Sequence, residues 1–182
     1  MLNSGSRASS LCCCGARPEK RRRVRVYMEE TLKGGCACGA VRYHLNAEPI
    51  FVQCCHCHDC QRQTGSAFVV NALLETTNII VESGTVNPIA VPTDSGLPHR
   101  IFRCADCQTA LWSEYRGFAP LRVVRVCTLD DPSALEPKAH IYTRSKLPWV
   151  QLPEGVPAFE AFYDGKKLWP AASLARWAAM RR

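Results

Sequence analysis

The chain has 182 residues, of which 47% are hydrophobic and 21% are charged, and this balance argues against a wholly disordered chain. A chain of this length can form one domain with a substantial core. It contains no run of about 18 apolar residues, which excludes a membrane-spanning helix, and its amino terminus has no apolar segment of the kind found in signal peptides. We therefore expect a cytoplasmic protein with no membrane partner.

Most of the positive charge lies at the amino-terminal end of the chain. Residues 1–27 carry seven basic side chains and one acidic side chain, so this segment holds +6 of the total net charge of +7. Residues 28–182 are nearly neutral, which argues against a nucleic-acid-binding face. We expect residues 1–27 to form a disordered basic tail, with Met28 as an alternative start of the protein. A nucleic-acid-binding arm and acylation of Cys12, Cys13 and Cys14 are less favoured.

Short alternating segments predict a mainly β domain. Val41, Tyr43 and Leu45 alternate with polar residues, which is the period of a half-buried strand. Glycine and proline punctuate the chain between further segments of this kind. A single helix is predicted over residues 173–180, with Ser173 as its N-cap. The other predicted strands cover residues 50–53, 67–74, 78–82, 89–91, 99–104, 110–112, 121–126 and 139–142.

The chain contains 12 cysteines, and their spacing is typical of metal sites. In a reducing compartment thiols stay free, and clustered cysteines more often bind metal than form disulfides. Disulfides between residues two or three apart are strained. The spacings are CxC, CxxC and CxCxxC, formed respectively by Cys36 and Cys38, by Cys104 and Cys107, and by Cys55, Cys57 and Cys60.

The first two of these pairs together supply four thiolates. Zinc favours four ligands in tetrahedral geometry, and thiolates suit it well. Gly34, Gly35 and Gly39 surround the first pair and give its turn the backbone freedom that it needs. A closed shell of four thiolates leaves no position for a substrate, so we predict a structural zinc held by Cys36, Cys38, Cys104 and Cys107. The competing interpretation is that either pair is simply buried free thiol.

The segment from Cys54 to Cys60 offers more than one ligand set. Three protein ligands with an open fourth position are the usual arrangement of catalytic zinc. Three thiolates reduce the Lewis acidity of the ion, which favours binding of a thiolate over activation of water. The spacing equally allows a purely structural site with Cys54, His56 or His58 as the fourth ligand. The candidate catalytic zinc ligands are Cys55, Cys57 and Cys60.

Four segments resemble the glutathione-dependent formaldehyde-activating enzyme family, which includes the centromere protein V group. They are GGCACGAVRY (34–43), CHCHDCQRQTGSAF (55–68), FRCADCQTALW (102–112) and HIYTRSKLPWV (140–150). The resemblance implies a zinc-dependent β-tent fold over residues 28–165, followed by an extension with a short helix over residues 166–182. It also implies two zinc ions per chain, divided between the cysteine clusters into a structural and a catalytic ion as above.

The activity implied by the resemblance is the condensation of formaldehyde with glutathione to S-hydroxymethylglutathione, a carbon–sulfur lyase reaction in the reverse direction. Glutathione is therefore the expected small-molecule partner. His56 and His58 are candidate proton shuttles, although a histidine beside metal ligands is more often a supporting or surface residue. Arg62 is a candidate partner for a substrate carboxylate, but a solvated arginine is the favoured interpretation. A different thiol or electrophile, or a non-catalytic zinc protein, remains an alternative.

Gln108 and Cys127 are each the subject of one further prediction. Members of the family commonly have glycine after the last structural cysteine, where this chain has Gln108. If the backbone there has positive φ, Gln108 carries a modest strain. Cys127 lies in an apolar, strand-like run and is expected in the core.

Overall fold

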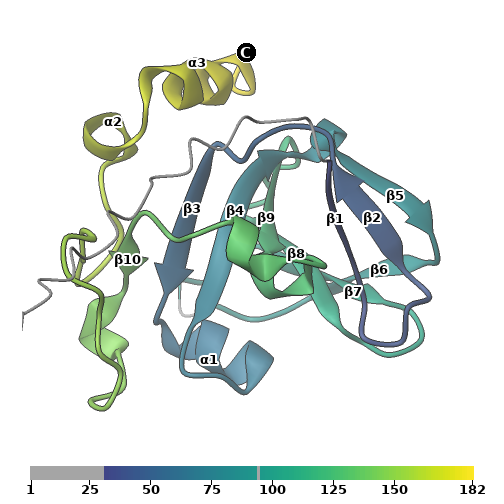
Figure 1. Ribbon diagram of the computed structural model, residues 1–182, viewed down its shortest axis with the longest axis horizontal. Coiled ribbons are helices and arrows are strands. Elements are labelled where there is room, and N and C mark those ends of the chain that lie inside the picture. Colours follow the sequence, from purple (N-terminus) through teal and green to yellow (C-terminus); the bar gives the residue numbers. More distant parts are fainter. Residues whose placement is uncertain (1–30, 94) are drawn as a thin grey trace, which may run out of the picture. The chain divides into compact units, whose positions relative to one another are not determined.

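Ten β-strands in two sheets dominate residues 31–93 and 95–182, the residues that the computed structural model describes (Figure 1). The strands are β1 (Leu32–Gly35), β2 (Arg42–Leu45), β3 (Phe51–Cys55), β4 (Val69–Glu75), β5 (Ile79–Ser83), β6 (Val86–Ala90), β7 (His99–Cys104), β8 (Ala110–Tyr115), β9 (Leu121–Arg125) and β10 (His140–Ile141). The mainly β prediction is confirmed. The predicted tail over residues 1–27 lies outside the described residues.

Helical segments are few and short in this part of the chain. The α-helices are α1 (His58–Thr64), α2 (Gly165–Leu168) and α3 (Ala171–Ala179). Four 3-10 turns are η1 (Thr76–Asn78), η2 (Val126–Thr128), η3 (Pro132–Ala134) and η4 (Thr143–Ser145). Among the described residues, no helix is long and apolar enough to cross a membrane.

The strands form a three-stranded sheet and a seven-stranded sheet. The small sheet has the order β1-β2-β5, and the large sheet has the order β10-β3-β4-β9-β8-β7-β6. All pairings are antiparallel except that of β10 with β3, which is parallel. This parallel pair brings residues more than 80 positions apart into register, with His140 opposite Cys54.

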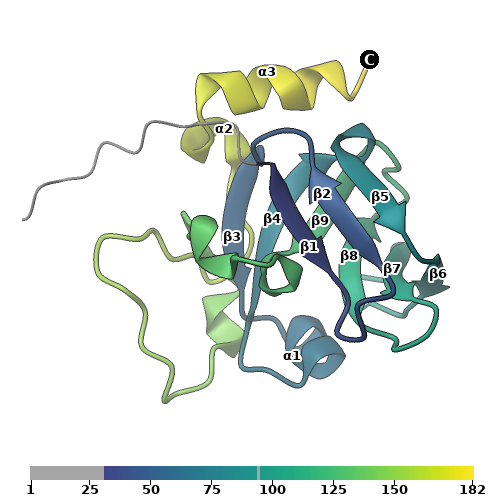
Figure 2. The ribbon, with the colours of Figure 1, turned by 45° about the vertical axis from the view of Figure 1, so that its right-hand side comes forward.

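The first core lies between the two sheets. Tyr43 is fully buried, as the alternating pattern predicts, and its ring packs edge-on against Trp112 of the large sheet at 5.4 Å. Its hydroxyl lies 2.6 Å from the Thr128 hydroxyl, so the buried phenol keeps a polar partner. Figure 2 shows β1 and β2 in front of β9 and β8, the layers that this core joins.

The second core connects the large sheet to the carboxyl-terminal segment. Phe51 of β3 stacks on Trp169 at 6.0 Å and contacts Tyr163 edge-on at 5.6 Å. The Tyr163 hydroxyl donates to Gln53 Oε1 at 2.6 Å and accepts from Trp169 Nε1 at 2.9 Å. Residues 166–182 therefore include side chains that complete a core of the domain.

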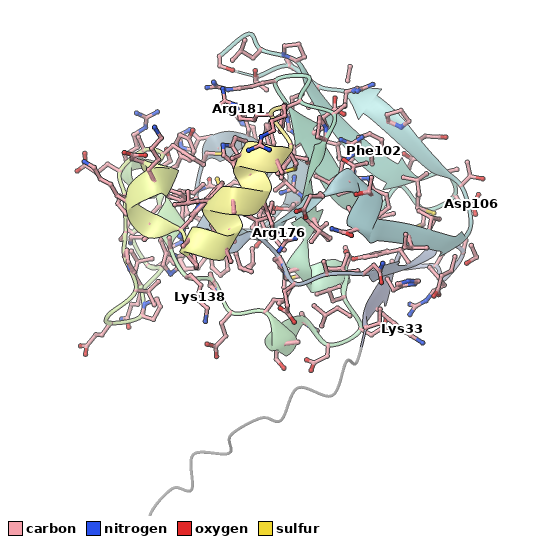
Figure 3. All side chains as sticks on the ribbon, turned by 90° about the horizontal axis from the view of Figure 1, so that it is seen from above. Lys33, Phe102, Asp106, Lys138, Arg176 and Arg181 are labelled. Carbon is pink, nitrogen blue, oxygen red and sulfur yellow. The ribbon has the colours of Figure 1, made fainter. Side chains whose placement is uncertain are left out.

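The predicted terminal helix exists, but its beginning differs from the prediction. Helix α3 begins at Ala171 with Pro170 at the N-cap, so Ser173 lies inside the helix. Its hydroxyl instead donates to the backbone carbonyl of Ile50 at 2.6 Å. Figure 3 looks down on α3 and labels Arg176, whose Nε donates to Glu75 Oε1 at 2.7 Å. These polar contacts fix α3 to the ends of β3 and β4.

The core position predicted for Cys127 is wrong. Cys127 is exposed, whereas its apolar neighbours predicted a core position. Strand β9 ends at Arg125, and the chain turns into η2 over the next three residues. Residues 122–126 are all buried, and Cys127, inside the η2 turn, is the first residue past β9 that faces solvent.

Candidate functional site

The fold brings together the four cysteines predicted to form the first site. Their sulfur atoms all lie within 4.8 Å of one another. The Cys36 and Cys38 sulfurs are 3.4 Å apart, and Cys38 is 3.9 Å from Cys104 across 66 residues of sequence. One pair belongs to the turn after β1, and the other to the β7–β8 hairpin. We call Cys36, Cys38, Cys104 and Cys107 the first cluster.

Tight turns aim the sulfurs of the first cluster at a common point. Gly39 adopts φ = +79°, and its amide donates to the Cys36 carbonyl at 3.1 Å, which closes the CxC turn. Gln108 has φ = +59°, in the left-handed region that favours glycine. This value confirms the condition on which the predicted strain depended. The Gln108 side chain donates to the Ala105 carbonyl at 3.0 Å and so is retained in the turn by a hydrogen bond.

A hydroxyl beside the first cluster favours one thiolate. Thr109 Oγ1 lies 3.1 Å from Cys107 Sγ, and this contact is the largest of the hydrogen bonds that lower the Cys107 pKa to about 5. The same hydroxyl accepts from the Ala37 amide at 3.2 Å. Thr109 thus contacts both turns that supply the cluster. At neutral pH the Cys107 thiol is therefore ionised and ready to bind a metal cation.

The three cysteines predicted for the second site also converge. The sulfurs of Cys55, Cys57 and Cys60 lie within 4.8 Å of one another, and we call them the second cluster. Cys55 ends β3, Cys57 is the N-cap of α1, and Cys60 lies in its first turn. Helix α1 was not predicted from the sequence, although it is what folds the CxCxxC segment back on itself. Gly65, with φ = +65°, ends it.

Ionisation within the second cluster is unequal. The pKa of Cys57 is lowered to about 2 by hydrogen bonds from the Cys55 and Cys60 thiols and from backbone amides. One of these amides is that of Cys60, 3.4 Å from Cys57 Sγ. The pKa of Cys55 is raised, first by its hydrogen bonds to the other two thiols and then by burial. Without metal, Cys57 therefore carries the thiolate charge, and a bound cation would be needed to ionise all three.

A third group lies on the opposite face of β3. Cys54, His56 and His140 are all buried, and their ligand atoms lie within 4.8 Å of one another. His56 Nε2 is 3.0 Å from His140 Nδ1 and 3.6 Å from Cys54 Sγ. Burial, followed by the charge of His140, lowers the His56 pKa to about 4, so the imidazole is neutral at physiological pH. His140 was not singled out in the sequence, because only the parallel pairing of β10 with β3 brings it here.

The other polar side chains of the α1 segment are less enclosed. His58 and Arg62 are exposed, which agrees with the solvated interpretation of Arg62. Gln61 instead anchors the helix, because its side-chain amide donates to the carbonyls of His56 and Ser145, each at 2.9 Å. His56 is fully buried and packs against Phe68, with ring centroids 5.5 Å apart. A role for His56 or His58 in proton transfer stays a prediction.

The donor chemistry of the two cysteine clusters fits zinc. All nine cysteines in the described residues are free thiols, so none is consumed by a disulfide. The first cluster supplies the complete four-sulfur set of a structural site, and the second supplies three sulfurs. Soft, closely spaced thiolates are the set that zinc prefers over magnesium or calcium. These groups are therefore able to hold metal ions.

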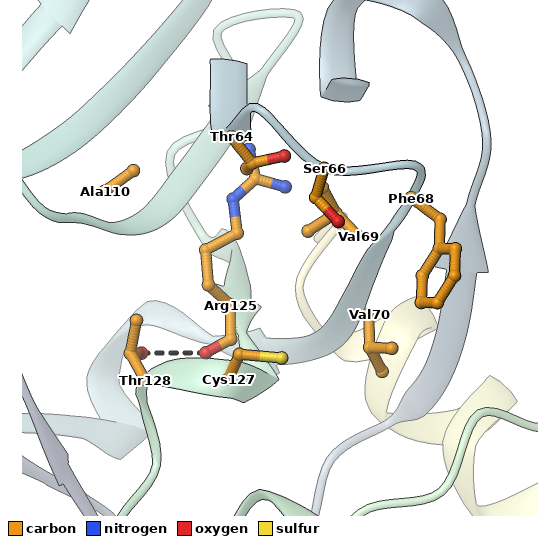
Figure 4. A pocket seen from close by; sticks show the side chains of 9 residues that line it. All are labelled: Thr64, Ser66, Phe68, Val69, Val70, Ala110, Arg125, Cys127 and Thr128. Atoms are coloured by element: carbon orange, nitrogen blue, oxygen red, sulfur yellow. Dashed lines mark hydrogen bonds between the residues drawn. The ribbon is translucent and has the colours of Figure 1, made fainter. Parts of the chain in front are cut away.

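A cavity of about 270 Å³ lies beside the end of α1 and the start of β4 (Figure 4), and its lining residues do not include the cysteines of the second cluster. Thr64, at the end of α1, lines it and donates its hydroxyl to the Cys60 carbonyl at 2.8 Å. Val69 lines it as well and is paired with Cys55 across β3 and β4. Arg125, the last residue of β9, and Cys127, in η2, also line the cavity, and in Figure 4 the Arg125 side chain points toward Thr64. The cavity is mostly apolar, with an exposed thiol and one buried guanidinium in its wall.

The mainly β domain, with groups of cysteine and histidine that could hold metal ions, fits the class of zinc β-tent domains. A family model described as glutathione-dependent formaldehyde-activating enzyme matches residues 31–145, more than half of the chain. The chain therefore belongs to this family.

Two individual proteins are also similar to parts of the chain. A curated Halomonas elongata protein, provisionally named a glutathione-dependent formaldehyde-activating enzyme, is 25% identical over 126 residues, which cover 66% of this chain and 80% of that protein. The crystal structure of a Rhodobacter sphaeroides protein is 18% identical with a TM-score of 0.42, covering 70% of this chain and 99% of the other.

Proposed function

We propose that the chain is a zinc-dependent carbon–sulfur lyase and synthase that interconverts glutathione and formaldehyde with S-hydroxymethylglutathione. Its family supports glutathione and formaldehyde as the substrates in general terms. The further assignments of two zinc ions, the direction of the chemistry and a cytoplasmic location belong to the proposal. The cytoplasm suits it because reduced thiols and glutathione coexist there.

One observation carries the proposal. In the second cluster, Cys55, Cys57 and Cys60 form a group of three, and no further histidine, cysteine or carboxylate of the described residues joins them within 4.8 Å. The first cluster, in contrast, has four. A tetrahedral ion held by three protein sulfurs keeps one position for an external ligand. Three thiolate ligands reduce the Lewis acidity of the ion, which favours a thiol over an activated water as that external ligand.

The reaction forms one sulfur–carbon bond and moves one proton. A sulfur–carbon bond forms as the carbonyl π bond breaks, and the thiol proton passes to the new hydroxyl oxygen. Zinc held by Cys55, Cys57 and Cys60 would supply a soft cation that favours the thiolate form of the incoming thiol. The chain's own contribution is to bind the thiol beside the cavity and orient it toward the aldehyde. Phe68 and Val69 supply apolar surface to the cavity wall.

The test follows exchange between glutathione and its formaldehyde adduct by NMR, because the uncatalysed reaction is itself appreciable. The zinc-loaded wild-type chain should accelerate the exchange, and Cys60→Ser should not. Cys127→Ser is the comparison, since it removes a thiol that lines the cavity but belongs to no cluster. It should retain both zinc ions, so a loss of activity in this variant would come from the cavity wall and not from a lost metal ligand.

The other outcomes identify the alternatives. Acceleration with a different thiol, but not with glutathione, would favour a related enzyme with another substrate. Failure to accelerate the exchange of any thiol, by a chain that holds two zinc ions, would overturn the proposal and indicate a non-catalytic zinc protein. Equal activity of Cys60→Ser and wild type would show that the second cluster is not the site of the chemistry.

A further inference from the structure

Arg125 is a buried cation with only neutral partners. Its side chain is part of a residue that is only 4% exposed. Its guanidinium Nη1 donates to Asn71 Oδ1 at 2.8 Å, and Nη2 donates to Ser113 Oγ at 3.2 Å. The Nε atom is buried without a partner. None of the carboxylates that the structure describes forms an ion pair with it.

Arg122, on the same strand, is a buried arginine whose charge is balanced by a carboxylate. Arg122 is 8% exposed, and its Nη1 lies 2.9 Å from Glu114 Oε2. Burial of a charge is costly unless an opposite charge compensates it. The fold supplies a carboxylate to Arg122 and none to Arg125. An anion near Arg125 would therefore stabilise its buried charge.

A second arginine adds to the positive charge near Arg125. Arg103 is half-buried, and it donates to Gln63 Oε1 at 2.7 Å and to the Gln108 carbonyl at 2.9 Å. Burial first, and then the positive charge of Arg125, lower the Arg103 pKa. Neither guanidinium forms an ion pair with a carboxylate of the described residues. An anion close by would stabilise both charges.

The second cluster is the source of negative charge that the fold places there. Arg125 pairs with Asn71 across β9 and β4, and Cys55 pairs with Val69 two residues earlier on β4. Side chains two positions apart on a strand share one face, so Cys55 and Arg125 lie on the same face of the large sheet. Arg125 also lines the cavity together with Thr64, whose hydroxyl donates to the Cys60 carbonyl at 2.8 Å.

We propose that Arg125 is the counter-charge of the second cluster, a positioning residue that stabilises the anion formed when three thiolates share one zinc ion. Three thiolates and one divalent cation leave a single negative charge, and a fourth thiolate from a substrate makes it two. The guanidinium therefore has two effects. The first is to favour retention of the metal ion, and the second is to favour binding of the substrate thiolate. The second effect rests on the function proposed above, whereas the first does not.

The test measures zinc per chain while a chelator is titrated against the full-length protein, without thiol or aldehyde. Arg125→Gln keeps hydrogen-bonding capacity but removes the charge, and Arg125→Lys keeps the charge. We expect Arg125→Gln to release its second zinc at a chelator concentration on the order of tenfold lower than the wild type, and Arg125→Lys to restore most of the difference. The zinc of the first cluster is an internal reference that should not shift.

Arg122→Gln is the matched control, because it removes a buried cation from the same strand but from a site that has its own carboxylate. It should lower the melting temperature and leave zinc retention unchanged. An equal loss of zinc in Arg122→Gln and Arg125→Gln, or wild-type retention in Arg125→Gln, would overturn the proposal.

A second variant tests the charge without deleting the arginine. Asn71→Asp is nearly isosteric and gives Arg125 a carboxylate of its own at the position of its present 2.8 Å partner. We expect the second zinc to be released as readily as in Arg125→Gln, which keeps the proposal testable even if that variant does not fold. Unchanged retention in Asn71→Asp would contradict it. Because no substrate is present, these results stand whether or not glutathione proves to be the thiol.

Discussion

The Thr109 hydroxyl lies 3.1 Å from the Cys107 sulfur, where it stabilises the thiolate of the first cluster. The Cys107 pKa in the folded chain is about 5, below its ordinary value of 9.0, so its contribution to stability is complete above pH 9 and is lost as the pH falls through 5. Thr109→Val keeps the shape but removes the hydroxyl. We expect it to raise the Cys107 pKa and to move zinc release from the first cluster to higher pH during acidification.

Zinc release against pH, followed with a chromogenic indicator, checks this prediction. Thr109→Ser retains a hydroxyl and should follow the wild-type curve. Superimposable curves for Thr109→Val and the wild type would show that the contact does not control the ionisation of Cys107.

The two clusters should differ in what they contribute to folding. Cys104 is fully buried and joins segments far apart in the chain, so binding of metal there is coupled to folding of the whole domain. Cys104→Ser should give insoluble protein or a large fall in melting temperature. Cys60→Ser removes a ligand from a short local loop, so it should remain folded and retain about one zinc of the expected two.

Zinc per chain and thermal melting of the two variants, measured side by side, decide this point. If Cys60→Ser unfolds the protein while Cys104→Ser stays folded and binds thiols, the structural and reactive roles are reversed.

Trp169 should be the main anchor of the carboxyl-terminal segment. It stacks on Phe51 at 6.0 Å and donates a hydrogen bond to Tyr163 at 2.9 Å. Trp169→Ala should lower the free energy of unfolding by about 2–3 kcal/mol, somewhat less than for a fully buried tryptophan. Trp149 is 71% exposed, and Trp149→Ala should change the free energy by less than about 0.5 kcal/mol. Urea unfolding of both variants provides the comparison, and similar losses would show that Trp169 is not an anchor.

Gln108 offers a stabilising substitution. Its φ of +59° is unfavourable for a residue with a Cβ, and glycine relieves that strain at the cost of a more flexible unfolded chain. We expect Gln108→Gly to raise the free energy of unfolding by roughly 0.5 kcal/mol, less what is lost with the side-chain bond to Ala105. A decrease, measured by urea unfolding of the zinc-loaded protein, would show that this bond outweighs the backbone strain.

The sequence predicts the cysteine clusters well because their ligands lie in local turns. A CxC or CxxC spacing fixes two sulfurs within one turn, and only the joining of two such turns depends on the fold. Most strands were likewise predicted from alternation, with ends displaced by a few residues. Helix α1 was missed because it is short and begins at a metal-ligand motif, although Gly65 after its last residue was an available signal.

The environment of the second cluster was beyond the reach of sequence reasoning. His140 reaches Cys54 only through a parallel strand pair, and no periodicity predicts that pairing. Arg125 lies in a run that reads as an ordinary strand, and its lack of a carboxylate partner is a property of the packed sheet. The apolar run around Cys127 continues past the end of β9, so hydrophobicity alone predicts a buried position for Cys127 that the structure does not give it. For His140 and Arg125 the deciding contact joins segments distant in the sequence.

The separation of the first cluster's halves has a consequence during synthesis. Cys38 leaves the ribosome 66 residues before Cys104, which at about 5–20 residues per second is a delay of several seconds. The early thiols must remain reduced throughout this interval, while β2 to β7 are still being made. Closure of the four-sulfur shell can follow only after Cys107 has emerged. The small sheet is thus joined to the large one through the first cluster only late in synthesis. An oxidant or a shortage of zinc at that stage would affect newly made chains more than chains that have already folded.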